Sequence, residues 1–161
     1  MKLKKTSITN YRCFKEAEID FDDHTTLIVG KNGAGKTAIL DAVAVAISTF
    51  LLGIDGGVSR SISKDDARYE FYDLDGTVDP QHQFPVSIES TGDCLDNHDV
   101  KWVRSLNSES GNTTVKEARE LTNISKNTQK RIMTGDKSLI LPLISYYGTG
   151  RLYAQKKEKK N

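Results

Sequence analysis

The 161-residue sequence is 37% hydrophobic and 28% charged, which is the composition of a globular domain or of part of one and excludes global disorder. No apolar run is long enough to span a membrane and no apolar segment follows the basic N-terminus, so we expect a cytoplasmic protein without membrane contact. The net charge of +1 combines an acidic first part with a basic second part, since residues 101–161 carry 13 Lys/Arg against 5 Asp/Glu, which suits either a solvated surface or a nucleic-acid contact.

The N-terminal third predicts two strands, a third strand and a long helix. Residues 3–10 and 17–21 alternate polar and apolar side chains, which predicts two short strands in an antiparallel pair. Residues 25–29 end in a continuous apolar run, typical of a strand covered on both faces. Residues 35–52 are apolar around nearly the whole circumference of a helix, which predicts a helix buried beneath a sheet and ending at Gly53.

The middle of the chain predicts a loop, two strands and a second helix. Residues 54–80 lack periodicity and are rich in Gly, Ser and acidic side chains, so we expect a surface loop there. Residues 84–90 and 100–106 predict a second small antiparallel element, and residues 115–133 have helical spacing.

The last apolar run completes the expected architecture. Residues 144–147 are apolar enough to join residues 25–29 in a predominantly parallel core sheet over the first helix. The first two strands form an antiparallel subsheet beside it. Residues 155–161 are a polar, Lys-rich end. The predicted fold class is therefore α/β.

One motif carries chemistry. Residues 30–37 read Gly-Lys-Asn-Gly-Ala-Gly-Lys-Thr and match the phosphate-loop pattern G-x-x-x-x-G-K-[ST]. Its glycines permit positive φ values, and the helix that follows adds unpaired N–H groups and the positive end of its dipole. Lys36 places an ammonium at the β- and γ-phosphates, and the Thr37 hydroxyl can ligate Mg²⁺. The motif therefore predicts a nucleoside triphosphate with Mg²⁺.

The phosphate loop and its surroundings resemble the start of the RecF and SMC type of ABC ATPase head. In that family an N-terminal strand ends in an Asn-aromatic-Arg/Lys-x-Phe element, which residues 10–14 match. A second strand then runs back and the phosphate loop begins near residue 30, as here. The resemblance implies a P-loop NTPase fold, with residues 1–161 as a partial ABC-type ATPase domain, the N-terminal lobe. Residues 141–151 are similar to a segment of bacterial ATPases in antiviral defence modules, including Septu-like systems.

The resemblance also implies a function. It implies ATP binding and, with a second lobe and dimerisation, ATP hydrolysis in DNA repair or maintenance or in antiphage defence. The implied partners are an ATP-dependent second copy, DNA and a partner nuclease. The family's signature segment, Walker B Asp-Glu and switch His are not found in residues 1–161. We therefore expect the N-terminal lobe of a longer ATPase, with negligible turnover by itself.

The resemblance and the motif together define the candidate site, with Lys36 as the catalytic residue and Thr37 as the ligand of Mg²⁺. The predicted ATP-binding residues are Arg12, Gly30, Lys31, Asn32, Gly33, Ala34, Gly35, Lys36, Thr37 and Ala38. Arg12 resembles a family residue near the nucleotide, although a surface arginine is an equal interpretation. Gly148 to Arg151 follow the last apolar run as the family's Q-loop does, but lack its usual Gln, so an ordinary turn is the alternative.

Other side chains suggest less. His24, His82 and His98 have no metal-ligand spacing, and Cys13 and Cys94 are too few for a disulfide framework. The aromatic residues of the strand-like segments are more often core than a base-stacking surface. These residues are Tyr69, Phe71, Tyr72 and Trp102.

Two other functions remain open from the sequence. A complete small P-loop kinase or GTPase usually begins with the phosphate-loop strand near residue 10, so the two strands expected before Gly30 count against it. A nucleotide-independent DNA-binding module would use the basic second part of the chain, and salt-dependent DNA binding that ATP does not affect would favour it.

Overall fold

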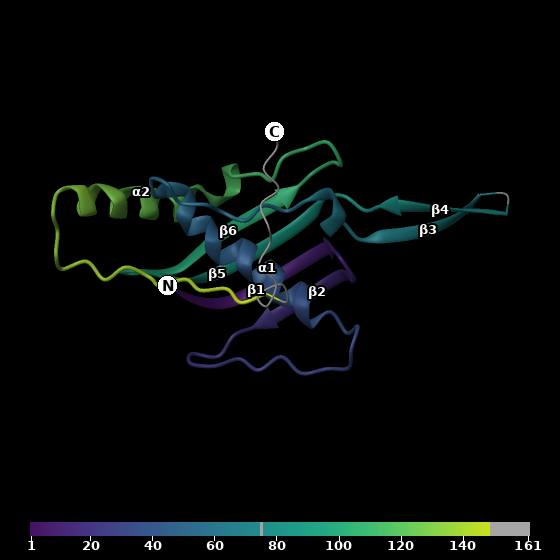
Figure 1. The fold of residues 1–161 in the computed structure, drawn as a ribbon, viewed down its shortest axis with the longest axis horizontal. Helices are drawn as coiled ribbons and strands as arrows, with labels where there is room; N and C mark the ends of the chain where they lie inside the picture. The colour runs from purple at the N-terminus through teal and green to yellow at the C-terminus, as the bar shows by residue number, and fades with distance from the viewer. Residues whose placement is uncertain (75, 149–161) are drawn as a thin grey trace, which may run out of the picture.

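The computed structural model describes residues 1–74 and 76–148, and its centre is a four-stranded antiparallel sheet in the order β2-β1-β5-β6, with helix α1 lying across it (Figure 1). The elements are β1 (Lys2–Tyr11), β2 (Phe14–Asp20), α1 (Lys36–Ser48), β5 (Val86–Cys94) and β6 (Asn97–Leu106).

The sheet forms because its strands alternate between the two faces. In β5, Val86 and Ile88 are fully buried while Glu89 is exposed, so one face of the strand packs in the core. The predicted antiparallel pair at the N-terminus is confirmed, with Ile8 opposite Ala17. The expectation of a separate second element was wrong, because β5 pairs with β1 along nearly its whole length and joins β6 to the same sheet.

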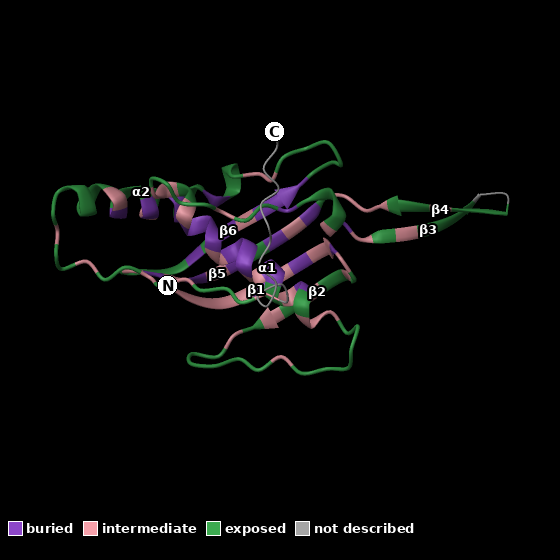
Figure 2. Cartoon of the chain, viewed as in Figure 1, coloured by how far each residue is buried: buried purple, intermediate pink, exposed green. Residues whose placement is uncertain are grey.

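Helix α1 packs its alanines against this sheet. Ala38, Ala42 and Ala46 are buried, and their small side chains let the helix approach Ile8 and Ile88 closely. Figure 2 shows that much of α1 is buried where it lies on the sheet. The helix continues as a 3₁₀ turn, η1 (Thr49–Gly53), so the helical run ends at the predicted glycine. One stretch, Lys36–Gly53, has the length and composition to cross a membrane, but 56% of it is buried within the described chain, as in the core helix of a globular fold.

A second apolar cluster lies at one end of the molecule, where α2 (Arg119–Met133) packs on η1 and β6. The predicted helix is confirmed, with a 3₁₀ turn, η3 (Lys116–Ala118), in its first residues. Trp102 is 1% exposed in this cluster, and its indole N–H donates a 3.0 Å hydrogen bond to the Ala46 carbonyl oxygen near the end of α1. Trp102 therefore joins α1 to the sheet by packing and by a polar contact.

Replacing Trp102 by phenylalanine is expected to lower the free energy of unfolding by about 1–3 kcal/mol, because it leaves the buried Ala46 carbonyl without this donor. Urea unfolding followed by far-ultraviolet circular dichroism measures this, since the substitution removes the chain's single tryptophan. An unchanged free energy of unfolding would show that the indole hydrogen bond contributes nothing.

Residues 54–80 are more ordered than the predicted loop. They contain a 3₁₀ turn, η2 (Lys64–Asp66), and a hairpin of β3 (Tyr69–Leu74) and β4 (Thr77–His82) that projects from the end of the molecule opposite α2 (Figure 1). Phe71 is 69% exposed and Tyr69 and Tyr72 are also exposed, so the expectation of core packing was wrong for these three and right for Trp102. The β3–β4 hairpin projects beyond the sheet, so the protein core does not cover these aromatic side chains.

The predicted parallel core strands do not form within the described residues. Residues 25–29 have no strand pairing, and Leu27 and Val29 are 81% and 77% exposed. Residues 144–147 likewise form no strand, and the run from 139 to 148 crosses α1 with Ile144 only half-buried. A parallel strand pairs with strands from distant parts of a chain. An apolar run indicates that a segment tends to be buried, but it does not show that such partner strands are present. The α/β class and the antiparallel subsheet are confirmed.

Candidate nucleotide-binding site

The phosphate loop lies between the irregular residues 21–29 and the first turn of α1. Gly33 and Gly35 have φ values of +82° and +88°, the left-handed conformation that side chains with a Cβ rarely adopt. Gly35 is the N-cap of α1. The predicted left-handed backbone is therefore confirmed at Gly33 and Gly35, whereas Gly30 does not have a positive φ.

The N-terminus of α1 presents donors and no competing acid. Within the described chain its N-cap has no side-chain hydrogen bond and its first turn has no acidic residue. The Lys36 ammonium donates to the carbonyl oxygens of Gly30 and Lys31, each at 2.8 Å, so the cation lies over the loop. Thr37 is exposed on the same turn. This set of N–H groups and one ammonium fits an anion, and a hydroxyl beside it fits a hard cation such as Mg²⁺.

The turn between β1 and β2 packs directly on this loop. A Cβ built on Gly35 would lie 2.5 Å from Phe14 Cζ and 2.7 Å from Cys13 Sγ, so only glycine fits. The turn itself contains Arg12 in the left-handed region, at φ +52°. The Asn-aromatic-Arg-x-Phe element therefore lies beside the phosphate loop.

Arg12 is held by two carboxylates. Its Nε donates to Asp66 at 2.9 Å, and its terminal nitrogen contacts Asp41 on α1. Burial lowers the pKa of the Arg12 guanidinium, but the hydrogen bond to Asp66 and the nearby negative charges outweigh it and raise the pKa above its ordinary value. Arg12 is therefore a fixed cation near the loop and not a freely solvated surface arginine.

Asp41 is a residue that the sequence analysis missed. Its side chain is 6% exposed and accepts from Arg12, from Arg60 at 2.9 Å and from the Tyr146 hydroxyl. The Arg60 guanidinium also lies over the Tyr146 ring, 5.1 Å from its centroid. A signal was present, because Asp41 is the one charged residue between Thr37 and Leu52 in an otherwise apolar helix.

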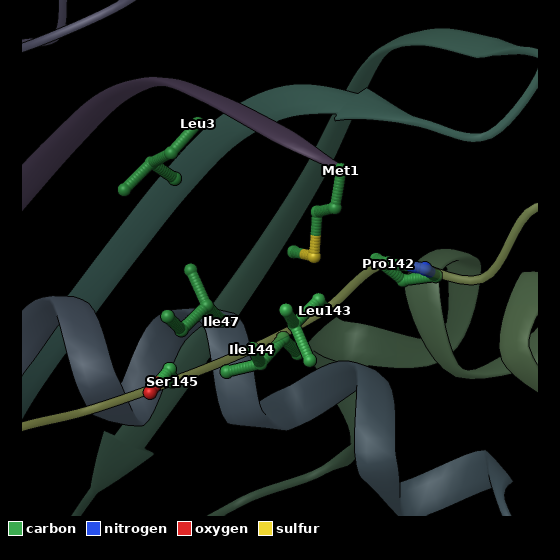
Figure 3. Close-up of a pocket in the computed structure, with 7 residues that line it drawn as sticks. All are labelled: Met1, Leu3, Ile47, Pro142, Leu143, Ile144 and Ser145. Atoms are coloured by element: carbon green, nitrogen blue, oxygen red, sulfur yellow. The ribbon is translucent and has the colours of Figure 1, made fainter.

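The other candidates lie away from this cluster or outside the described residues. Residues 149–151 lie outside them, so the comparison with the Q-loop stays a prediction, although Gly148 lies against Tyr146. In residues 1–74 and 76–148, no three His, Cys, Asp or Glu side chains gather as metal ligands. A pocket further along α1 contains no phosphate-loop residue and is lined by Met1, Leu3, Ile47 and residues 142–145 (Figure 3).

Segments of the chain are similar in sequence to DNA-repair proteins. It is 54% identical over 43 residues to the DNA replication and repair protein RecF of Flavobacterium johnsoniae, covering 27% of this chain and 12% of that protein. It is 48% identical over 44 residues to the DNA double-strand break repair Rad50 ATPase of Archaeoglobus fulgidus, covering 27% and 5%. A longer match, 30% over 90 residues, is to RecF of Phocaeicola vulgatus and covers 55% and 23%. The chain thus spans less than a quarter of the length of each of these relatives.

Among solved structures, a chain from work on ATP-driven dimerisation and DNA-stimulated activation of SMC ATPases aligns with a TM-score of 0.49 and 18% identity, covering 94% of this chain and 89% of that one. The AAA domain family matches residues 5–161, which is nearly the whole sequence. The family match and the RecF and Rad50 relatives confirm the resemblance to RecF-type ATPases, and the chain belongs to the AAA domain family.

Proposed function

We propose that this chain binds ATP with Mg²⁺ through residues 30–38 and supplies the nucleotide-binding half of an ATPase. The observation that supports this most is the phosphate loop itself, with Gly33 and Gly35 in the left-handed region at the uncapped N-terminus of α1 and the Lys36 ammonium above it. Titration of the chain with ATP in the presence and absence of Mg²⁺, followed by calorimetry, tests the proposal directly.

Each residue has a separate role in this proposal. The Lys36 ammonium exchanges its two carbonyl partners for the β- and γ-phosphate oxygens, which makes it the catalytic residue, because charge develops there during phosphoryl transfer. The N–H groups of the loop and of Ala38 bind phosphate oxygens, and the Thr37 hydroxyl ligates the metal. Mg²⁺, when bound, neutralises phosphate charge. Arg12 adds a fixed positive charge from the adjoining turn.

The relatives support a cellular setting for the proposal. RecF is a DNA replication and repair protein, and Rad50 is an ATPase of DNA double-strand break repair. We therefore propose a role in DNA repair or maintenance for the whole protein. The basic residues 101–161 suit a contact with DNA. An ATP-dependent dimer of the whole protein, a partner nuclease, a role in Septu-like antiphage defence and a cytoplasmic location stay predictions.

Residues 1–161 by themselves are expected to hydrolyse ATP at a negligible rate, far below the order of 1 per second of ordinary ATPases. Thr37 offers one metal ligand, and the nearest buried carboxylate, Asp41, is already engaged by two arginines. A coupled assay of steady-state phosphate release measures this. Turnover at ordinary rates would mean that these residues already contain a complete catalytic centre.

A further inference from the structure

Three distant parts of the chain meet at the Asp41 carboxylate. Arg12 comes from the turn after β1, Arg60 from the irregular residues 54–63, and Tyr146 from the extended residues 139–148. Neither of the last two segments has strand or helix hydrogen bonds around its contact residue. Their positions on α1 therefore depend on contacts with side chains: the Arg60 backbone N–H donates to Ser48 Oγ at 2.9 Å, and Asp41 supplies the contact that both segments share.

The burial of the Asp41 carboxylate strengthens its hydrogen bonds to these groups. Its side chain is 6% exposed, whereas those of Arg12 and Arg60 are 33% and 40% exposed, so the charged hydrogen bonds are shielded from water on the Asp41 side. Burial, followed by the hydrogen bond to Asp41, raises the pKa of the Tyr146 phenol, which keeps it a donor. Asp66 provides a natural comparison, because it also binds Arg12 but contacts neither Arg60 nor Tyr146.

Asp41 also lies close to the proposed nucleotide site. It follows Thr37 by four residues in α1, so the two side chains share one face of the helix about 6 Å apart along its axis. Arg12, the third group on Asp41, precedes Cys13 and Phe14, which pack on Gly35. A movement of the phosphate loop or of the first turn of α1 is therefore expected to move Asp41 by two routes. One route is the helix itself, and the other is the β1–β2 turn, which carries Arg12.

We propose that Asp41 is a positioning residue that holds Arg60 and residues 139–148 against α1, and that it couples their position to the state of the phosphate loop. The first half concerns the chain without nucleotide. The second half rests on the proposed function. Asp41 does not touch the phosphates in this proposal; it acts through the groups that it binds.

Chymotryptic cleavage after Tyr146 measures the first half. To enter the apolar specificity pocket of chymotrypsin, the Tyr146 ring must leave Asp41, and because Tyr147 is the next residue, cleavage after either tyrosine requires this segment to leave α1. Mass spectrometry gives the initial rate of cleavage after residues 146 and 147 relative to that of an unstructured tyrosyl peptide added to each digest. Asp41→Asn is expected to raise this ratio about tenfold, because it removes the charged acceptor.

Two variants complete the test. Tyr146→Phe keeps an aromatic cleavage site but loses the hydroxyl, so it is expected to raise the ratio to a similar extent, and it carries the test if Asp41→Asn does not fold. Asp66→Asn, the matched carboxylate control, is expected to leave the ratio within about twofold. Ratios unchanged from the wild type in both Asp41→Asn and Tyr146→Phe would overturn the positioning role.

Addition of ATP and Mg²⁺ to the same digests tests the coupling. The ratio of the wild type is expected to change by about threefold or more, and that of Asp41→Asn to remain constant at nucleotide concentrations that calorimetry shows to be saturating. An equal response in both proteins, or none in saturated wild type, would overturn the coupling. Failure of ATP to bind the wild type would overturn the proposed function and the coupling, and the nucleotide-free digests would still decide the positioning role.

Discussion

Replacing Lys36 by alanine is expected to abolish measurable ATP binding. The ammonium lies over the loop, where it donates to the carbonyl oxygens of Gly30 and Lys31. Without it, the phosphate charge is left to backbone dipoles and to Arg12, which is already paired with two carboxylates, and a charged hydrogen bond of this kind is worth at least about tenfold to a hundredfold in affinity. Calorimetry with ATP and Mg²⁺ measures the loss.

Lys126→Ala is the matched control for this experiment, because it removes the same charge from the exposed surface of α2, away from the loop. Its affinity for ATP is expected to equal that of the wild type. Circular dichroism shows whether each variant keeps its fold. An unchanged affinity in a folded Lys36→Ala protein would contradict nucleotide binding at this loop.

Replacing Gly35 by alanine is expected to lower the free energy of unfolding by more than about 2 kcal/mol. One part of this cost comes from the left-handed backbone at φ +88°, which disfavours any Cβ. The other part comes from crowding, because the new Cβ would lie 2.5 Å from Phe14 Cζ and 2.7 Å from Cys13 Sγ. Thermal or urea unfolding measures the sum.

Gly33→Ala separates the two parts. Gly33 has a similar φ of +82°, but a Cβ there would meet nothing within 4 Å, so only the backbone cost of about 1 kcal/mol is expected. Equal destabilisation by the two substitutions would show that Phe14 and Cys13 move aside at no cost. The comparison also shows which glycine variant leaves the fold intact enough to measure nucleotide binding.

Local patterns in the sequence were sufficient for the elements whose partners are near in the chain. The β1–β2 pair is a hairpin, α1 is signalled by the long apolar run after the phosphate loop and α2 by the helical spacing of its own residues, so each could be predicted. The strand predicted at residues 25–29 depends on distant partners, which periodicity does not reveal. The pairing of β5 with β1 has the same origin, since about 80 residues separate the paired positions Ile8 and Ile88.

The candidate site divides in the same way. Residues 30–37 are contiguous, and their motif is associated with one backbone conformation. The position of the phosphate loop and the left-handed conformation of Gly33 and Gly35 could therefore be predicted. The Asp41 cluster could not, because it joins residues 12, 41, 60 and 146, and only the folded chain brings them together. The pairing of Arg12 with Asp66 was hidden for the same reason, since residues 54–66 carry no periodic signal.

The β3–β4 hairpin offers a place to add sequence to this protein. Its root is fixed to the sheet by a backbone hydrogen bond from Arg68 N to Asn10 O at 2.9 Å and is closed by one from Gln83 N to Arg68 O at 2.8 Å, while its two strands pack mainly on each other. At the far end Gly76 has open space around it. Exposed hairpin tips of this kind accept insertions, so an affinity tag or a small fluorescent domain placed beside Gly76, at the tip and not at the root near Arg12, would report on the protein without disturbing the phosphate loop. Natural variation in the length of this arm would be tolerated for the same reason.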